Sequence, residues 1–109
     1  MSTSAANWVD ADSNPEKGFY AYVDTESVST QGKYKQAFTK YINIPGEYYL
    51  VALKSFDCKS NPRRSKATYI TKFDLTGNVT ASSEMTGISF SPVLPESMEE
   101  GLASIVCSF

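Results

Sequence analysis

The chain has 109 residues, a formal net charge of −2, 41% hydrophobic residues and 13% aromatic residues. This length and composition predict one domain with one modest core, and they exclude a wholly disordered chain. The negative charge argues against a nucleic-acid partner, because binding through phosphate contacts needs a basic surplus. No apolar run approaches the roughly 18 residues that cross a bilayer, so we expect no transmembrane segment.

The first half of the chain predicts strands. Structure is expected to begin at Trp8, followed by a polar loop over 12–18 and a strand over 19–23. Turn formers over 24–27 and at 31–32 precede a strand over 33–44. Apolar residues on both parities of 48–57 predict a central strand that is covered on both faces. Cys58 shares the parity of Phe56, so its thiol is expected on the face that buries Phe56.

The second half predicts one more strand, a hairpin and a helix. In the strand over 66–75, apolar and polar residues alternate except at Ile70. The residues 76–78 predict a tight turn, and the segment from Val79 fits either an edge strand or a loop. Ser97-Met-Glu-Glu100 has the form of a capping box, and apolar residues follow at helical spacing: Met98, Leu102, Ile105 and Val106. Gly101 costs this helix about 1 kcal/mol relative to Ala, so we expect tertiary anchoring.

The two cysteines, Cys58 and Cys107, end a predicted strand and the predicted helix. A disulfide between them would close a loop of about 50 residues and stabilise the domain by about 4 kcal/mol in the chain-entropy model. Such a bond indicates an oxidising compartment. The alternative is two unrelated buried thiols in a cytosolic protein. A zinc site is not expected, because the chain has no histidine and two thiolates do not complete a four-ligand site.

The residue types predict no catalytic site, metal or cofactor. Without histidine, nucleophilic catalysis by a Ser–His or Cys–His pair is not available. The six glycines form no phosphate-binding loop. Neighbouring carboxylates such as Asp10 and Asp12, or Glu99 and Glu100, are expected to be solvated surface charges. We therefore predict a protein that is not an enzyme.

Two groups of residues are candidates for binding a partner. The aromatic group offers large contact area at low entropic cost, although its members also fit packing under the helix: Tyr34, Phe38, Tyr41, Tyr48 and Tyr49. The basic group fits an acidic partner, a solvated turn, or an arginine that anchors Asp57: Lys59, Arg63, Arg64 and Lys66. Asn78-Val-Thr80 matches a glycosylation sequon, but we expect it to serve as turn chemistry.

The order of these signals resembles a known family. It runs from Trp8 through Tyr22-Val-Asp24-Thr-Glu-Ser27-Val28 and Leu53-Lys-Ser55-Phe-Asp57-Cys58 to Arg64, Tyr69, Gly77, Pro95-Glu-Ser97 and Cys107. These residues resemble the surface-adhesin protein E-like family of bacterial envelope proteins over about residues 7–107. The resemblance implies an α+β fold, in which a C-terminal helix is tethered by Cys58–Cys107 across the concave face of an antiparallel sheet of about six strands. Residues 7–109 would form this one domain, after a disordered remnant over 1–6.

The resemblance also implies a role in binding. The namesake adhesin forms a homodimer and binds host matrix and serum proteins such as vitronectin and laminin. This chain reads Gly46-Glu-Tyr-Tyr49 where basic residues are expected for such ligands. We expect an exported binding protein in the periplasm or at the outer-membrane surface of a Gram-negative bacterium. The alternatives are a periplasmic inhibitor or immunity protein with a protruding loop over 10–16 or 46–49, and a structural subunit of the envelope.

The first seven residues are small and polar, where an export segment would be apolar. If the protein is exported, this sequence is expected to be a trimmed mature form with an added initiator Met.

Overall fold

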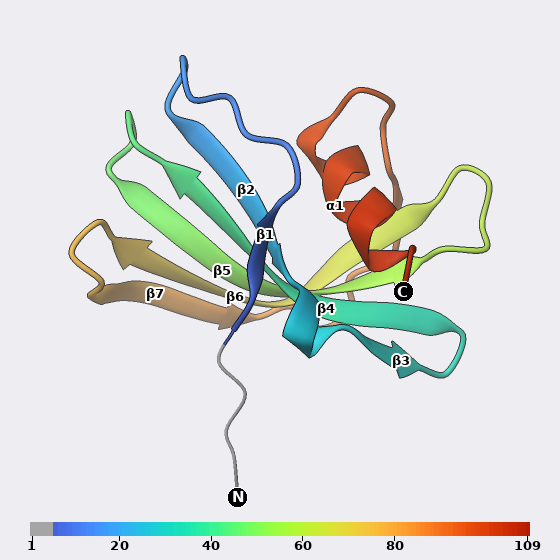
Figure 1. Cartoon of the computed structure of the whole chain (residues 1–109). Helices are drawn as coiled ribbons and strands as arrows, with labels where there is room; N and C mark the ends of the chain where they lie inside the picture. Colours follow the sequence, from blue (N-terminus) through green and yellow to red (C-terminus); the bar gives the residue numbers. More distant parts are fainter. Residues whose placement is uncertain (1–5) are drawn as a thin grey trace, which may run out of the picture.

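The structure, a computed structural model, describes residues 6–109 and contains one antiparallel sheet and one C-terminal helix (Figure 1). The sheet has eight strands, and its main path runs β1-β2-β4-β5-β6-β7. The elements are β1 (Trp8–Asp10), β2 (Phe19–Asp24), the 3₁₀ helix η1 (Thr25–Ser27), β3 (Ser29–Gln31), β4 (Tyr34–Asn43), β5 (Tyr48–Asp57), β6 (Arg64–Asp74), β7 (Val79–Glu84), β8 (Ser91–Pro92) and α1 (Met98–Val106). This arrangement confirms the predicted fold class.

The predicted strands all form, and the short strands were missed. The main path has six members, and β3 and β8 add short pairings to β4 and β6. The segment from Val79 is an edge strand, with every residue exposed. The expected disorder over 1–6 falls almost entirely on residues outside the described range.

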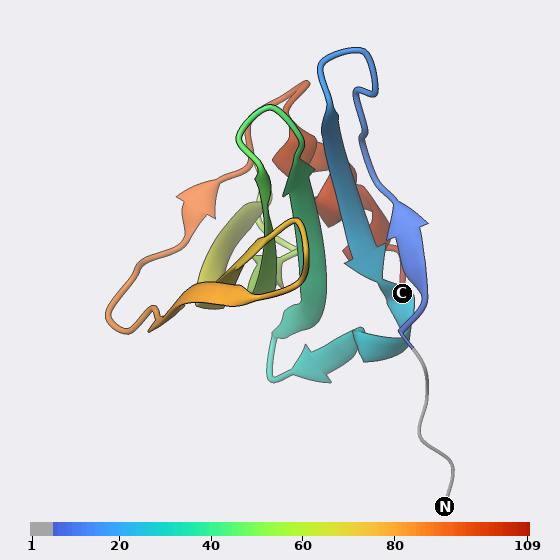
Figure 2. The ribbon, with the colours of Figure 1, turned by 90° about the vertical axis from the view of Figure 1, so that its left-hand side faces the viewer.

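The core lies between α1 and the concave side of the sheet (Figure 1, Figure 2). Ala21 and Ala37 of the sheet are almost fully buried, and their small side chains let the helix approach closely. Phe56, Val23 and Val106 are the largest fully buried side chains. The predicted apolar positions of α1 face this core, together with Ala103.

The central strand β5 is covered less than expected. Ala52 and Phe56 are buried on the helix side, and Ser55 is buried on the other side. Tyr49, Val51 and Leu53 remain only half-buried. The prediction that both faces are covered is therefore wrong, because the single helix lies on the concave side and leaves the opposite face open.

A bulge in β6 explains the irregular pattern around Ile70. Leu53 pairs with Tyr69 and Lys54 pairs with Ala67, so Thr68 is an extra residue in the ladder. The Thr68 hydroxyl donates a hydrogen bond to the carbonyl oxygen of Leu53 at 3.1 Å. Residues before and after the bulge consequently exchange faces, and the regular alternation expected over 66–75 is wrong.

The start of α1 is capped much as the sequence predicts. The backbone N–H of Glu100 donates to the Ser97 hydroxyl at 3.2 Å. The Glu100 carboxylate accepts from the N–H of Glu96, at 3.0 Å, rather than from that of Ser97. The Ser97 N–H instead donates to the carbonyl of Leu94. The box is therefore displaced by one residue on its carboxylate side, which corrects the expected reciprocal pair.

Cys58 and Cys107 form a disulfide, with 5.6 Å between their Cα atoms and a sequence separation of 49. Both residues pack against the core cluster. The bond joins the end of β5 to the C-terminal end of α1, so the prediction of a disulfide is confirmed and the alternative of two free thiols is wrong.

Gly101 lies where α1 passes closest to the loop after β1. A Cβ atom at this position would lie 2.7 Å from the carbonyl oxygen of Ala11 and 2.9 Å from the Cβ of Asp12. Because one of these atoms belongs to the backbone, it cannot rotate away. Close packing therefore requires the glycine that the helix propensity disfavours.

Loss of the disulfide should destabilise the domain. We expect the Cys58→Ala/Cys107→Ala variant to lose about 4 kcal/mol of unfolding free energy, because its unfolded chain is no longer cross-linked. Urea unfolding followed by circular dichroism measures this change. Reductant should weaken the wild type and leave the variant unchanged. An equal midpoint for the oxidised wild type and the variant would contradict the expectation.

Gly101→Ala should also destabilise the domain, by about 1–3 kcal/mol, although Ala is the better helix former. The added methyl group would overlap the backbone of Ala11 and push α1 away from the sheet. Ser104→Ala is the matched control, because Ser104 is exposed on the same helix. Urea unfolding of both variants tests this expectation, and a stabilised Gly101→Ala protein would refute it.

Candidate functional site

The face of the sheet opposite α1, called here the convex face, carries rows of aromatic and apolar side chains. Residues that pair across neighbouring strands share a face. The pairings therefore align a first row from β2 to β6: Tyr20, Ile42, Tyr49 and Phe73. A second row joins Phe38, Leu53 and Tyr69. Phe38 and Tyr69 are each 40% exposed, so this face presents large apolar groups to solvent.

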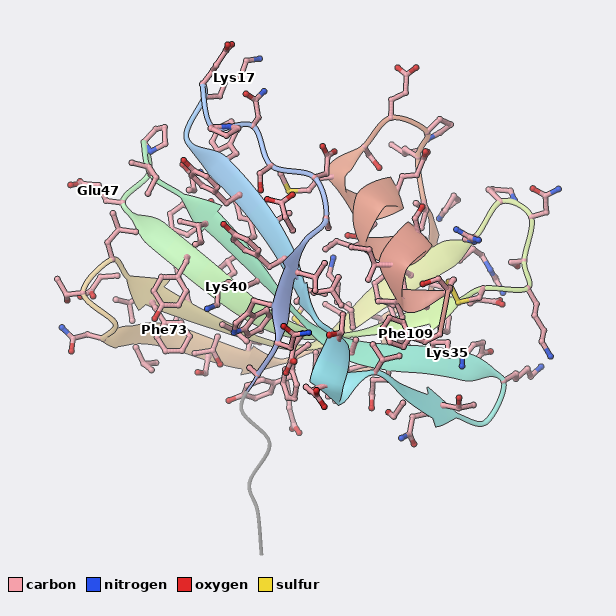
Figure 3. All side chains as sticks on the ribbon, in the orientation of Figure 1. Lys17, Lys35, Lys40, Glu47, Phe73 and Phe109 are labelled. Atoms are coloured by element: carbon pink, nitrogen blue, oxygen red, sulfur yellow. A yellow bond between two sulfur atoms is a disulfide. The ribbon has the colours of Figure 1, made fainter. Side chains whose placement is uncertain are left out.

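Lys40 lies within the aromatic side chains of this face, and its position relative to Phe73 is shown in Figure 3. Its ammonium nitrogen is 4.4 Å from the centre of the Trp8 ring and 5.8 Å from that of Tyr49. The Tyr49 and Phe73 rings stack at 4.7 Å with an angle of 9° between their planes. The cation and the stack hold these rings side by side, which gives the convex face a preformed aromatic surface.

One corner of the convex face combines basic and aromatic groups. The Phe90 ring lies 4.6 Å from that of Tyr34. The Arg64 guanidinium carbon and the Lys66 ammonium lie 5.6 and 4.8 Å from the centre of the Phe90 ring. The Arg64 guanidinium also donates to the Asp57 carboxylate at 2.7 Å and to the Ser60 hydroxyl at 3.1 Å. Arg64 thus has the anchoring role that was one of its predicted alternatives.

The structure divides the predicted candidates among three places. Tyr34, Phe38 and Tyr49 lie on the convex face, and Arg64 and Lys66 lie at its corner. Tyr41 and Tyr48 lie on the concave side, 6.4 Å apart between ring centres. Lys59 and Arg63 are exposed in the turn between β5 and β6.

Several residues of the convex face were missed from the sequence: Trp8, Tyr20, Tyr22, Tyr69, Phe73 and Phe90. Strand parity indicates some of these positions within each strand. The bulge at Thr68 conceals the face of Tyr69 and Phe73 relative to Ala67, and Phe90 lies in a loop without any periodic signal.

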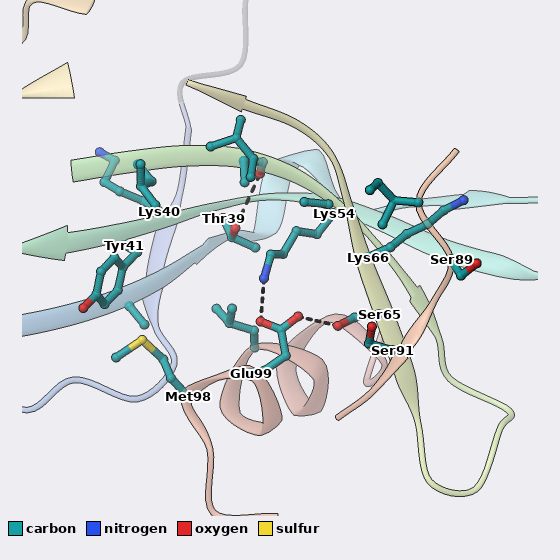
Figure 4. A pocket seen from close by; sticks show the side chains of 17 residues that line it. Thr39, Lys40, Tyr41, Lys54, Ser65, Lys66, Ser89, Ser91, Met98 and Glu99 are labelled. Atoms are coloured by element: carbon teal, nitrogen blue, oxygen red, sulfur yellow. Dashed lines mark hydrogen bonds and ion pairs between the residues drawn. The ribbon is translucent and has the colours of Figure 1, made fainter. Parts of the chain in front are cut away.

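A cleft of about 420 Å³ opens on the concave side, between α1 and the segment that precedes β8 (Figure 4). The Lys54 ammonium bridges it and contacts the Glu99 carboxylate at 2.5 Å. Ser65 donates to the other carboxylate oxygen of Glu99. Tyr41 lies at one end of the cleft, where burial, and secondarily Tyr48, raise the pKa of its phenol.

The turn at the end of β6 uses the residues of the predicted sequon. The Asp74 carboxylate accepts from the backbone N–H groups of Thr76 and Asn78 and from the Thr76 hydroxyl. These hydrogen bonds lower the pKa of Asp74, that from the Thr76 side chain contributing most. The expected turn chemistry is present.

Residues 6–109 contain no group of three or more His, Cys, Asp or Glu side chains placed to hold a metal ion. In the same part of the chain, no helix is long and apolar enough to cross a membrane.

The sheet, its tethered helix and the open aromatic face define a small, disulfide-linked α+β scaffold. The family model of surface-adhesin protein E matches residues 8–108, nearly the whole chain. The chain therefore belongs to the surface-adhesin protein E family. Membership indicates a surface protein with an adhesive role rather than an enzyme. Searches of curated proteins and of solved structures find no match.

The contact between Arg64 and Asp57 makes a testable statement about charge. The hydrogen bond from Arg64 is the largest cause of the lowered pKa of the Asp57 carboxyl. The ion pair therefore stabilises the fold above the pKa that Asp57 has in the unfolded chain. This contribution is lost as the pH falls through the lower, folded pKa.

We expect Arg64→Gln to raise the pKa of Asp57 towards its ordinary value of 3.8. A ¹³C NMR titration of the side-chain carboxyl measures this. Lys66→Gln is the matched control, because Lys66 also lies over Phe90 but leaves the Asp57 contact intact. If both variants shift the pKa equally, Arg64 is not its specific cause.

Proposed function

We propose that this protein is an exported, adhesin-like protein of a Gram-negative envelope and that its convex face binds a protein partner. The partner is a host matrix or serum protein, or another envelope protein. The exposed aromatic rows on the side of the sheet away from α1 are the observation that supports this proposal. A host ligand would make the protein a virulence factor.

The chemistry of the convex face suits a protein partner. Tyrosine and phenylalanine supply large contact area with few rotatable bonds, and such side chains dominate the binding energy of many interfaces. The rings of Tyr49 and Phe73 already stack in the free protein, so little order remains to be imposed on binding. The basic corner at Arg64 and Lys66 adds positive charge at the rim, which favours an acidic segment of the partner.

The proposed location follows from the disulfide. Bonds such as Cys58–Cys107 form and persist in the periplasm and outside the cell, where thiols are not kept reduced. An outer-membrane surface location would also give the convex face access to host proteins.

A homodimer is part of the proposal, because the convex face is also suitable for a second copy. A dimer through this face would compete with another protein ligand. Light scattering of the wild type and of a convex-face variant separates the two uses. A dimer that dissociates in the variant would identify the second copy as the occupant.

The inhibitor or immunity protein is the second candidate, and two protruding loops favour it. The loop before β2 and the loop between β4 and β5 lie together, and the Ile44 N–H donates to the carbonyl of Gly18 at 2.9 Å. Lys17 and Glu47 mark their tips in Figure 3. A paired set of loops at one end of a rigid sheet suits insertion into an enzyme's cleft.

We expect the double variant Phe38→Ser/Tyr69→Ser to bind its protein ligand at least about tenfold more weakly than the wild type, because two exposed anchors are lost. The ligands tested are vitronectin, laminin and proteins recovered from the envelope of the parent organism. Surface plasmon resonance measures the affinities.

Leu94→Ser is the matched control, because Leu94 is 65% exposed and lies outside the convex face. It should retain wild-type affinity. Equal binding by the double variant and the wild type would overturn the role of the convex face. A captured hydrolase or toxin whose binding is lost on Glu47→Lys would support the inhibitor instead.

A further inference from the structure

The cleft on the concave side is a second open surface, separate from the convex face. Small side chains keep its floor low: Thr39 of β4, Ala52 of β5 and Ala67 of β6. Larger apolar residues form its sides, among them Ile88 and Met98. Its volume of about 420 Å³ lies in the range of small-molecule sites, which are mostly apolar with a few polar groups.

Lys54 supplies the polar group of the cleft. Its side chain is 21% exposed and its ammonium contacts one carboxylate oxygen of Glu99. An ammonium group has three N–H donors. Among the described residues the hydrogen bond to Glu99 uses one of them, so two remain for a ligand. In Figure 4, Tyr41 and Met98 lie on one side of this ion pair, and Ser65 and Ser91 lie on the other.

Glu99 determines which head group this site accepts. Its carboxylate already neutralises Lys54 and is fixed by the hydrogen bond from Ser65. A ligand carboxylate at Lys54 would place a second negative charge beside Glu99, and like charges at this separation repel. An uncharged carbonyl or hydroxyl oxygen accepts from Lys54 without this repulsion.

We infer that the cleft binds an uncharged acyl amphiphile. Its ester or hydroxyl oxygens accept hydrogen bonds from Lys54, and its aliphatic chain lies along Leu50, Ile70, Ile88 and Met98. The aliphatic nature of these side chains favours a hydrocarbon chain over a stacked planar ring. The site lies on the opposite side of the sheet from the convex face, so the inference does not depend on the proposed function.

The test uses two eight-carbon ligands with different head groups, monooctanoylglycerol and octanoate. Both are titrated into ¹⁵N-labelled protein below their micellar concentrations, and amide shifts in two-dimensional NMR spectra locate the site. We expect saturable shifts at residues that line the cleft, and an affinity for monooctanoylglycerol at least about tenfold higher than for octanoate. Tighter binding of octanoate, shifts centred on the convex face, or no saturable shift would each overturn the inference.

Variants assign the site to its residues. Ala67→Leu fills the floor of the cleft and should abolish binding, whereas Ala81→Leu on the exposed strand β7 should leave it unchanged. Lys54→Met should weaken binding of monooctanoylglycerol about tenfold through the lost charge-assisted hydrogen bond. Ile88→Asp provides a second test, because Ile88 is 44% exposed and its substitution spares the core. Unchanged affinity in both Ala67→Leu and Ile88→Asp would refute this location.

Discussion

The attachment of α1 to one end of the concave face determines much of the remaining structure. A helix of nine residues is too short to be stable alone, so tertiary contacts must hold it. The Cys58–Cys107 bond fixes its C-terminal end and the contact of Glu99 with Lys54 fixes its first turn. Gly101 lets the middle of the helix approach the loop after β1. Three separate contacts therefore hold a short element whose helical propensity is weak.

One short helix cannot cover both faces of a sheet whose main path has six strands, and this imbalance creates the open surfaces. The convex face has only its own side chains to shield its rings, which accounts for the stack of Tyr49 on Phe73 and the position of Lys40. On the concave side, the helix reaches part of the floor and leaves the cleft. Both surfaces consequently use the same strands β4 and β5, with alternate residues on opposite sides.

The sequence predicts the parts of the structure that depend on local pattern. Strand alternation and the spacing of Leu102 and Val106 locate the long strands and the helix, and the positions of Cys58 and Cys107 indicate their bond. The bulge at Thr68 was not predictable, because one extra residue changes the face without changing the composition. The contact of Phe90 with Tyr34 was also missed, because it joins a loop to a distant strand. Candidate residues were therefore found as types, and only the fold assigned them to faces.

Family membership and the surfaces answer different questions about this protein. The family model covers the scaffold, including both cysteines, and a scaffold can be shared by proteins with different ligands. Ligand choice instead depends on exposed side chains such as Phe38 and Tyr69, whose replacement would leave the buried core intact. Gly46-Glu-Tyr-Tyr49 illustrates the difference, since it lacks basic residues while its strand pairs normally in the sheet. The adhesive class therefore follows from the fold, whereas the identity of the partner must be determined by the open faces.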